Sequence, residues 1–228
     1  MTILLAIETS TEIASVALLR EEGVIIRELT GVQTHSQGVL PAIQEILSEA
    51  CITLNQCNAI AFGCGPGAFT GVRTACGIVQ GLAFGADLPI LPIVSLQAMA
   101  QAAHELCSDV EFVCVLDARM GEVYWAHYRY QNQIWQQVTE PALSTSEQVL
   151  LYSNSLNVNL VLGNGAIPNI STPSEKVIFK MPHAEYVAKL ALIDFSLGKQ
   201  LQADQAQPLY LRNKIALTTL ERAILKAK

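Results

Sequence analysis

Two acidic residues in this sequence each follow an apolar run and lead into a tight turn. Glu8 follows the first apolar run of the chain and precedes Ser10, and Asp117 follows a second such run and precedes Arg119. Backbone N–H groups in such turns bind phosphate, and a neighbouring carboxylate can hold the accompanying metal. Glycine lets phosphate approach the backbone closely, so the arginine in the second turn predicts an obstructed or weakened phosphate site.

The loop 65–71, Gly-Pro-Gly-Ala-Phe-Thr-Gly, opens a helix of small residues. No lysine follows its last glycine, so it is not a P-loop, and its spacing does not fit G-x-G-x-x-G. The N–H groups at a helix start can bind an anion. A plain structural turn is the favoured interpretation.

Residues that usually carry metal or nucleophilic chemistry are scattered along the chain. The four histidines are far apart, and no His-x-x-x-His, Cys-x-x-Cys or Gly-x-Ser-x-Gly motif occurs. The sequence therefore predicts no catalytic residue and no metal ligand.

Three glycines recur every four residues in the helix that follows this loop. They are Gly77, Gly81 and Gly85, and Arg73 lies on the same stripe. Each glycine inside a helix costs roughly 0.5–1 kcal/mol relative to alanine, so a compensating close approach by another element is expected. That element is either the protein's own sheet or a helix of another chain.

The helix expected over 36–50 has an apolar face too wide for simple one-sided burial. Together with the glycine stripe, this face predicts a two-helix docking surface for a partner. The predicted interface residues are His35, Val39, Leu40, Ile43, Leu47, Arg73, Gly77, Gly81 and Gly85.

The elements that carry these residues follow one order twice. Apolar runs predict three strands at 2–7, 14–19 and 24–29, then alternating helices and strands, giving βββαβαβα. Two prolines place the strand 88–94 near a sheet edge. The second half repeats the order more loosely, with elements expected that include a strand over 133–138 and helices over 146–152 and 184–197.

Two such lobes side by side describe the actin-like ATPase fold. We therefore predict an α/β protein with two lobes, 1–97 and 98–228, each a mixed five-stranded sheet with an antiparallel meander and flanking helices. In nucleotide-binding members of that fold the nucleotide lies between the lobes. The candidate degenerate nucleotide site comprises Glu8, Ser10, Asp117, Arg119, Gly163 and Gly165.

Composition narrows the classes of protein further. The chain has 228 residues, 51% hydrophobic and 15% charged, with a formal net charge of −6. Hydrophobicity excludes disorder, and the acidic balance argues against a standalone nucleic-acid binder. Unpaired cysteines, and the absence of a signal or a membrane-length apolar run, predict a cytoplasmic protein. The basic segment 212–228 is interpreted as a solvated face, with contact to a nucleic acid as the alternative.

Several segments form a combination typical of one family. They are 5–11, 35–37, 40–43, 65–73 and 95–100 in the first half, and 117–119, 122–124 and 208–212 in the second. These segments resemble the bacterial TsaB family, with most of the match in the first lobe. Glu8 stands where the family usually has aspartate, which sets the carboxyl group one methylene further out.

The resemblance implies a non-catalytic subunit. TsaB proteins share the fold of TsaD, which transfers a threonylcarbamoyl group to adenosine 37 of ANN-reading tRNAs and carries a histidine pair absent here. The resemblance also implies a heterodimer with TsaD through the two first-lobe helices, a ternary complex with TsaE, and contact with tRNA only through the complex. It further implies a homodimer without TsaD, and no firm cofactor beyond weak or interface-bound ADP or ATP.

Two other functions remain open from the residues. The fold permits an ATPase or small-molecule kinase that uses Glu8, Ser10 and Asp117, which Arg119 and the missing glycines oppose. A glycoprotease-like metalloenzyme is a second alternative, which the absence of clustered ligands opposes.

Overall fold

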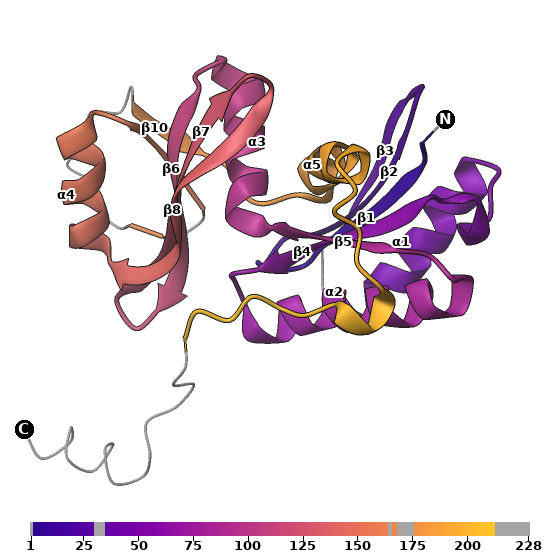
Figure 1. The fold of residues 1–228 in the computed structure, drawn as a ribbon. Coiled ribbons are helices and arrows are strands. Elements are labelled where there is room, and N and C mark those ends of the chain that lie inside the picture. The colour runs from indigo at the N-terminus through magenta and orange to yellow at the C-terminus, as the bar shows by residue number, and fades with distance from the viewer. Residues whose placement is uncertain (1, 30–34, 164–165, 168–175, 213–228) are drawn as a thin grey trace, which may run out of the picture.

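The computed structural model describes residues 2–29, 35–163, 166–167 and 176–212. Two five-stranded mixed sheets stand side by side with helices on their faces (Figure 1). The predicted fold class is confirmed. No helix in the described ranges is long and apolar enough to cross a membrane.

The first sheet has the order β3-β2-β1-β4-β5. β1 pairs antiparallel with β2 and parallel with β4, and β5 lies at the edge as its prolines predicted. The strands are β1 (Leu4–Glu8), β2 (Ala14–Arg20), β3 (Gly23–Leu29), β4 (Ala59–Gly65) and β5 (Ile90–Val94).

Alternation along β1 separates two apolar cores. Leu5 and Ile7 pack with residues of helices α1 (His35–Glu49) and α2 (Phe69–Ala86) on one face. Leu4 and Ala6 pack on the other face with α3 (Ser95–Cys107) and α5 (Ala184–Ser196). Both faces of this strand are buried, which accounts for its unbroken apolar sequence.

The second sheet has the order β10-β9-β6-β7-β8. Its strands β6, β7 and β8 form an antiparallel meander, and β9 and β10 extend it in parallel on the β6 side. The helix α4 (Ser146–Leu156) packs on its outer face. The strands are β6 (Glu111–Arg119), β7 (Glu122–Gln131), β8 (Ile134–Thr145), β9 (Asn159–Leu162) and β10 (Val177–Phe179).

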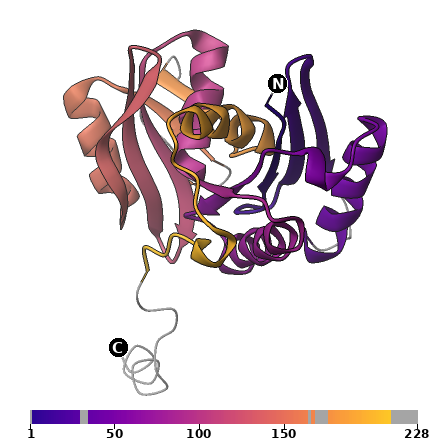
Figure 2. The ribbon, with the colours of Figure 1, turned by 45° about the vertical axis from the view of Figure 1, so that its right-hand side comes forward.

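Helices α3 and α5 lie between the two sheets and share one core with both (Figure 2). α5 comes late in the chain, yet it packs against β1 and β2 of the first sheet. Leu201, later still, bridges Ile90 at the edge of that sheet. The boundary between residues 97 and 98 stays a prediction.

Two predicted ends differ from the structure by four residues or more. β8 continues seven residues beyond the expected end at Val138, because it is an edge strand with an irregular register that accommodates Pro141. α4 continues to Leu156 and ends where Asn157 adopts a left-handed conformation (φ 57°). The basic segment 212–228 lies, apart from Arg212, outside the described residues.

Ser15 of β2 ties the start of α5 to the first sheet. The backbone N–H of Ala184 donates to the Ser15 hydroxyl oxygen at 2.9 Å in a buried position. In a Ser15→Ala variant this N–H loses its partner, so the free energy of unfolding should fall by about 1–3 kcal/mol in urea titrations. The control is Ser196→Ala at the exposed end of α5, and equal stability of both variants would contradict the assignment.

Candidate functional site

A cavity of about 800 Å³ lies between the two sheets. Four segments line it: the turn 10–12, the start of α2, the end of β6, and the C-terminal residues 209–212, with Tyr124 and Met181 beside them. We call residues 208–212 the strap. This cavity occupies the place where the predicted nucleotide site was expected.

Glu8 is completely buried at the end of β1. One carboxyl oxygen accepts the backbone N–H of Ser10 at 2.6 Å, and the other accepts the Ser95 hydroxyl at 2.8 Å. Burial raises the pKa of this carboxyl group, outweighing the hydrogen bonds that favour its charged form. Glu8 therefore joins β1 to the start of α3 and does not line the cavity.

The buried glutamate depends on a glycine in the neighbouring strand. A Cβ atom at Gly63 would lie 1.9 Å from Glu8 Oε2. The sequence analysis missed this relation, although the pairing of β1 with β4 places Ile7 beside Phe62 and so brings the two positions together. Gly63 provides the space for the longer acidic side chain.

Asp117 does line the cavity, but both oxygens of its carboxyl group contact Arg119. One oxygen accepts the backbone N–H of Arg119 at 2.8 Å, and the other pairs with the Arg119 guanidinium at 3.1 Å. Arg119 and Met120 both have positive φ angles, 65° and 59°, so the turn is tight without glycine at either position. The obstruction of phosphate binding at this turn stays a prediction.

Of the two glycines expected in a nucleotide-binding turn, Gly163 is close to a neighbouring strand. A Cβ atom at Gly163 would lie 2.4 Å from Leu116 Cδ2, so a larger residue there would have to displace the end of the Leu116 side chain. Gly165 lies outside the described residues.

The residues present do not fit a metal–triphosphate site. Glu8 is buried away from the cavity and Asp117 pairs with Arg119, so neither carboxylate is placed to hold a metal ion there. Ser10 lines the cavity, and its hydroxyl oxygen is buried with no hydrogen-bond partner among the described residues. Within the described part of the chain, no three or more His, Cys, Asp or Glu side chains are grouped to hold a metal ion.

The loop before α2 is shaped by the turn after β1. A Cβ atom at Gly67 would lie 2.2 Å from the Ser10 carbonyl oxygen, and one at Gly71 would lie 1.9 Å from that of Thr9. The Thr9 hydroxyl donates to the Gly71 carbonyl at 2.7 Å. These glycines let two backbones approach closely, so the structural interpretation of the loop is supported.

The glycine stripe of α2 faces outward. Gly77, Gly81 and Gly85 are exposed, and a Cβ atom at each would have no atom of the described part of the chain within 4 Å. The sheet-facing side of α2 consists of other residues, among them Val79 and Ala83. The first of the two open explanations, close packing on the protein's own sheet, is therefore wrong.

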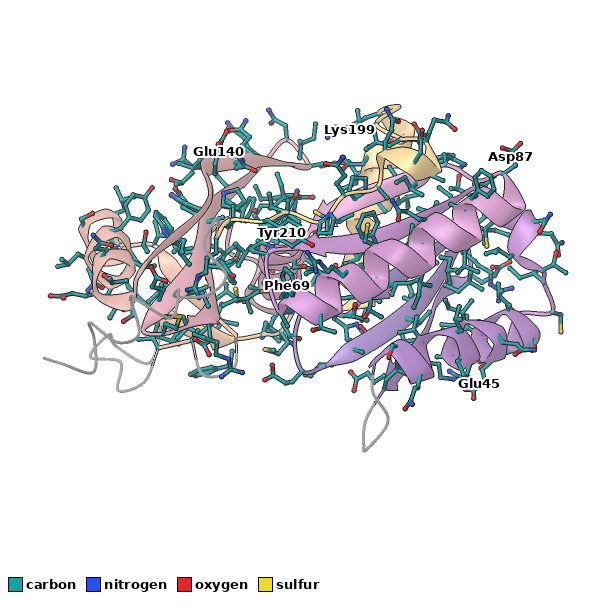
Figure 3. All side chains as sticks on the ribbon, turned by 90° about the horizontal axis from the view of Figure 1, so that it is seen from below. Glu45, Phe69, Asp87, Glu140, Lys199 and Tyr210 are labelled. Atoms are coloured by element: carbon teal, nitrogen blue, oxygen red, sulfur yellow. The ribbon has the colours of Figure 1, made fainter. Side chains whose placement is uncertain are left out.

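Two large apolar side chains are also exposed, one on α2 and one on α1. Phe84 is 84% exposed and Leu40 of α1 is 50% exposed. α1 and α2 lie next to each other on the same side of the first sheet (Figure 3). We call this surface the two-helix face; its residues are Leu40, Leu47, Arg73, Gly77, Gly81, Phe84 and Gly85.

Two predicted interface residues need correction. Val39 and Ile43 are buried, because they hold α1 on the first sheet. Leu47 is partly buried against the same core, and His35 begins α1. Phe84 was missed, although its place three residues after Gly81 was the signal that could have found it.

The two-sheet topology and the cleft between the sheets define an actin-like α/β protein. A family model described as TsaD, tRNA N6-adenosine threonylcarbamoyltransferase, matches residues 11–223. The proteins named "tRNA threonylcarbamoyladenosine biosynthesis protein TsaB" from Haemophilus influenzae and Escherichia coli are 41% and 39% identical. Each match covers 93% of this chain, and 94% and 96% of those proteins.

Solved structures agree with this match. A crystal structure from Pseudomonas aeruginosa, of a protein with similarity to peptidase YeaZ, is 36% identical with a TM-score of 0.84. The match covers 93% of this chain and 100% of the other. A structure of YeaZ from the same organism gives a TM-score of 0.81. The chain belongs to the TsaB family.

The role of Glu8 predicts a specific pH dependence. A raised pKa means that the neutral carboxyl group stabilises the folded state fully below the unfolded glutamate pKa of about 4.3, and that this contribution is lost as pH rises through the folded pKa. A Glu8→Gln variant should therefore gain stability relative to the wild type as pH rises through this window, as measured by denaturant titrations. The control is Glu21→Gln at an exposed turn, and a relative loss of stability on raising the pH would contradict the assignment.

The two classes of glycine in the loop and in α2 should respond oppositely to alanine. Gly71→Ala places a methyl group against the Thr9 backbone and should lower the free energy of unfolding by about 1–3 kcal/mol or more. Gly77→Ala fills open space and should raise it by roughly 0.5–1 kcal/mol. Urea titrations measure both, and a neutral Gly71→Ala would count against the packing described.

Proposed function

We propose that this protein is a non-catalytic subunit of the tRNA threonylcarbamoyladenosine pathway that forms a heterodimer with TsaD through its two-helix face. In this role it supports transfer of the threonylcarbamoyl group, by TsaD, to the adenosine beside the anticodon of ANN-reading tRNAs. The observation that carries the proposal is the outward-facing glycine stripe of α2.

The stripe supports docking because it has no other physical explanation within the described residues. Gly77 and Gly81, inside the helix, together cost roughly 1–2 kcal/mol relative to alanine, and no described residue packs closely enough on them to offset this. A partner helix could approach the backbone of α2 along this line and bury Leu40 and Phe84, which are exposed here.

The contacts in the cleft favour a non-catalytic subunit over an enzyme. Both acids expected at a nucleotide site form contacts with the protein itself. The catalytic step is therefore assigned to TsaD, with TsaE joining the pair and tRNA contacted through the complex in the cytoplasm. Without TsaD, the same face would pair two copies of this chain.

A leucine in the middle of the stripe tests the proposal. Gly81→Leu should weaken binding to TsaD at least tenfold in titration calorimetry, because a branched side chain keeps the helices apart. The same variant should reduce threonylcarbamoyladenosine formation in a reaction containing TsaD, TsaE and threonylcarbamoyl-adenylate.

The matched control is Asn154→Leu, which places the same side chain on the exposed surface of α4. It should bind TsaD like the wild type. The proposal fails if Gly81→Leu also binds like the wild type, or if the isolated chain turns over Mg-ATP steadily.

A further inference from the structure

Arg73 is the only charged residue of α2, and it lies where the two-helix face meets the cavity between the sheets. Its guanidinium carbon lies 3.6 Å from the centre of the Phe69 ring. Its Nε–H donates to the hydroxyl oxygen of Tyr210, at 2.6 Å. Figure 3 shows Phe69 and Tyr210 close together at the N-terminal end of α2.

These contacts fix the side chain from two directions. Phe69 stacks on the guanidinium, an arrangement that stabilises the cation, and Tyr210 uses the Nε–H. The two terminal nitrogens remain, and together they form the edge that pairs with a carboxylate through two parallel hydrogen bonds. An exposed arginine held in this way has lost much of the conformational entropy that binding would otherwise remove.

Arg73 differs from the other arginines around the cavity in having no acidic partner among the described residues. Arg119 pairs with Asp117, and Arg212 pairs with Glu122. The positive end of the α2 dipole lies close to Arg73, which adds to the attraction for an anion.

The charge around Arg73 matches a single carboxylate. Arg119 and Arg212 also line the cavity, but each is already paired with an acid, so Arg73 offers one positive charge without such a partner among the described residues. The neighbouring stripe is glycine-rich and apolar, which suits a protein helix.

We propose that Arg73 receives an aspartate or glutamate carboxylate of TsaD at the edge of the two-helix face, and that Tyr210 of the strap is a positioning residue that holds Arg73 for this contact. This inference rests on the proposed function, and adds the chemistry of the partner group and the role of the strap.

Calorimetric titration of TsaD with the full-length variants tests it. Arg73→Ala should weaken binding roughly 10- to 100-fold, the range for removing a charge-assisted pair. Arg73→Lys should lose less affinity for TsaD than Arg73→Ala, because lysine keeps the positive charge but cannot form the two parallel hydrogen bonds. Tyr210→Phe should weaken binding roughly two- to fivefold through greater freedom of Arg73.

Salt dependence separates a charge contact from general damage to the fold. Wild-type affinity should fall as sodium chloride rises, and the Arg73→Ala affinity should fall less steeply. Lys199→Ala, at an exposed site beyond α5, is the control for loss of one positive charge. Thermal melting of each variant shows whether it is folded.

The outcomes distinguish the two proposals. If Gly81→Leu abolishes binding while Arg73→Ala binds within twofold of the wild type, the carboxylate contact is overturned and the proposed function stands. If Tyr210→Phe leaves both affinity and salt dependence unchanged, the positioning role is overturned. If the wild type does not bind TsaD, both proposals fail.

Discussion

The structure depends on close contact between the turn after β1 and the first turn of α2. Gly67 and Gly71 lie against the backbone carbonyl groups of Ser10 and Thr9, at positions where even a methyl group has no space. This contact fixes where α2 begins, and Val79 and Ala83 then hold its inner side on the sheet. The remaining side, with its three glycines, must face outward because a helix presents residues four apart on one face.

The same region shows how the two acids expected at the cleft contribute to the fold. Glu8 serves as an internal connection between β1 and α3, and Gly63 makes that connection sterically possible. Asp117 stabilises a tight turn by pairing with Arg119. Both acids thus form contacts within the protein, while the strap contacts Cys64 and Arg73 on the side of the first sheet and Glu122 of the second sheet.

Much of the fold could be predicted because its signals are local. The unbroken apolar run of β1, the helical spacing of α1 and the prolines of β5 each specify an element by themselves. The end of β8 could not be predicted, because Pro141 is tolerated only by an edge strand, and strand order is not visible in a sequence.

For the site, the four-residue spacing of the glycines revealed the stripe, but the direction in which the stripe faces depends on tertiary packing. The burial of Val39, Ile43 and Glu8 depends on packing for the same reason.

The central claim is that TsaD covers the two-helix face. Hydrogen exchange of backbone amides in the full-length chain, with and without TsaD, measures this directly. The account predicts slower exchange in α1 and in α2 from Arg73 to Gly85 on adding TsaD, with exchange in α4 unchanged. Slower exchange confined to α4 and the second sheet, with α2 unaffected, would contradict it.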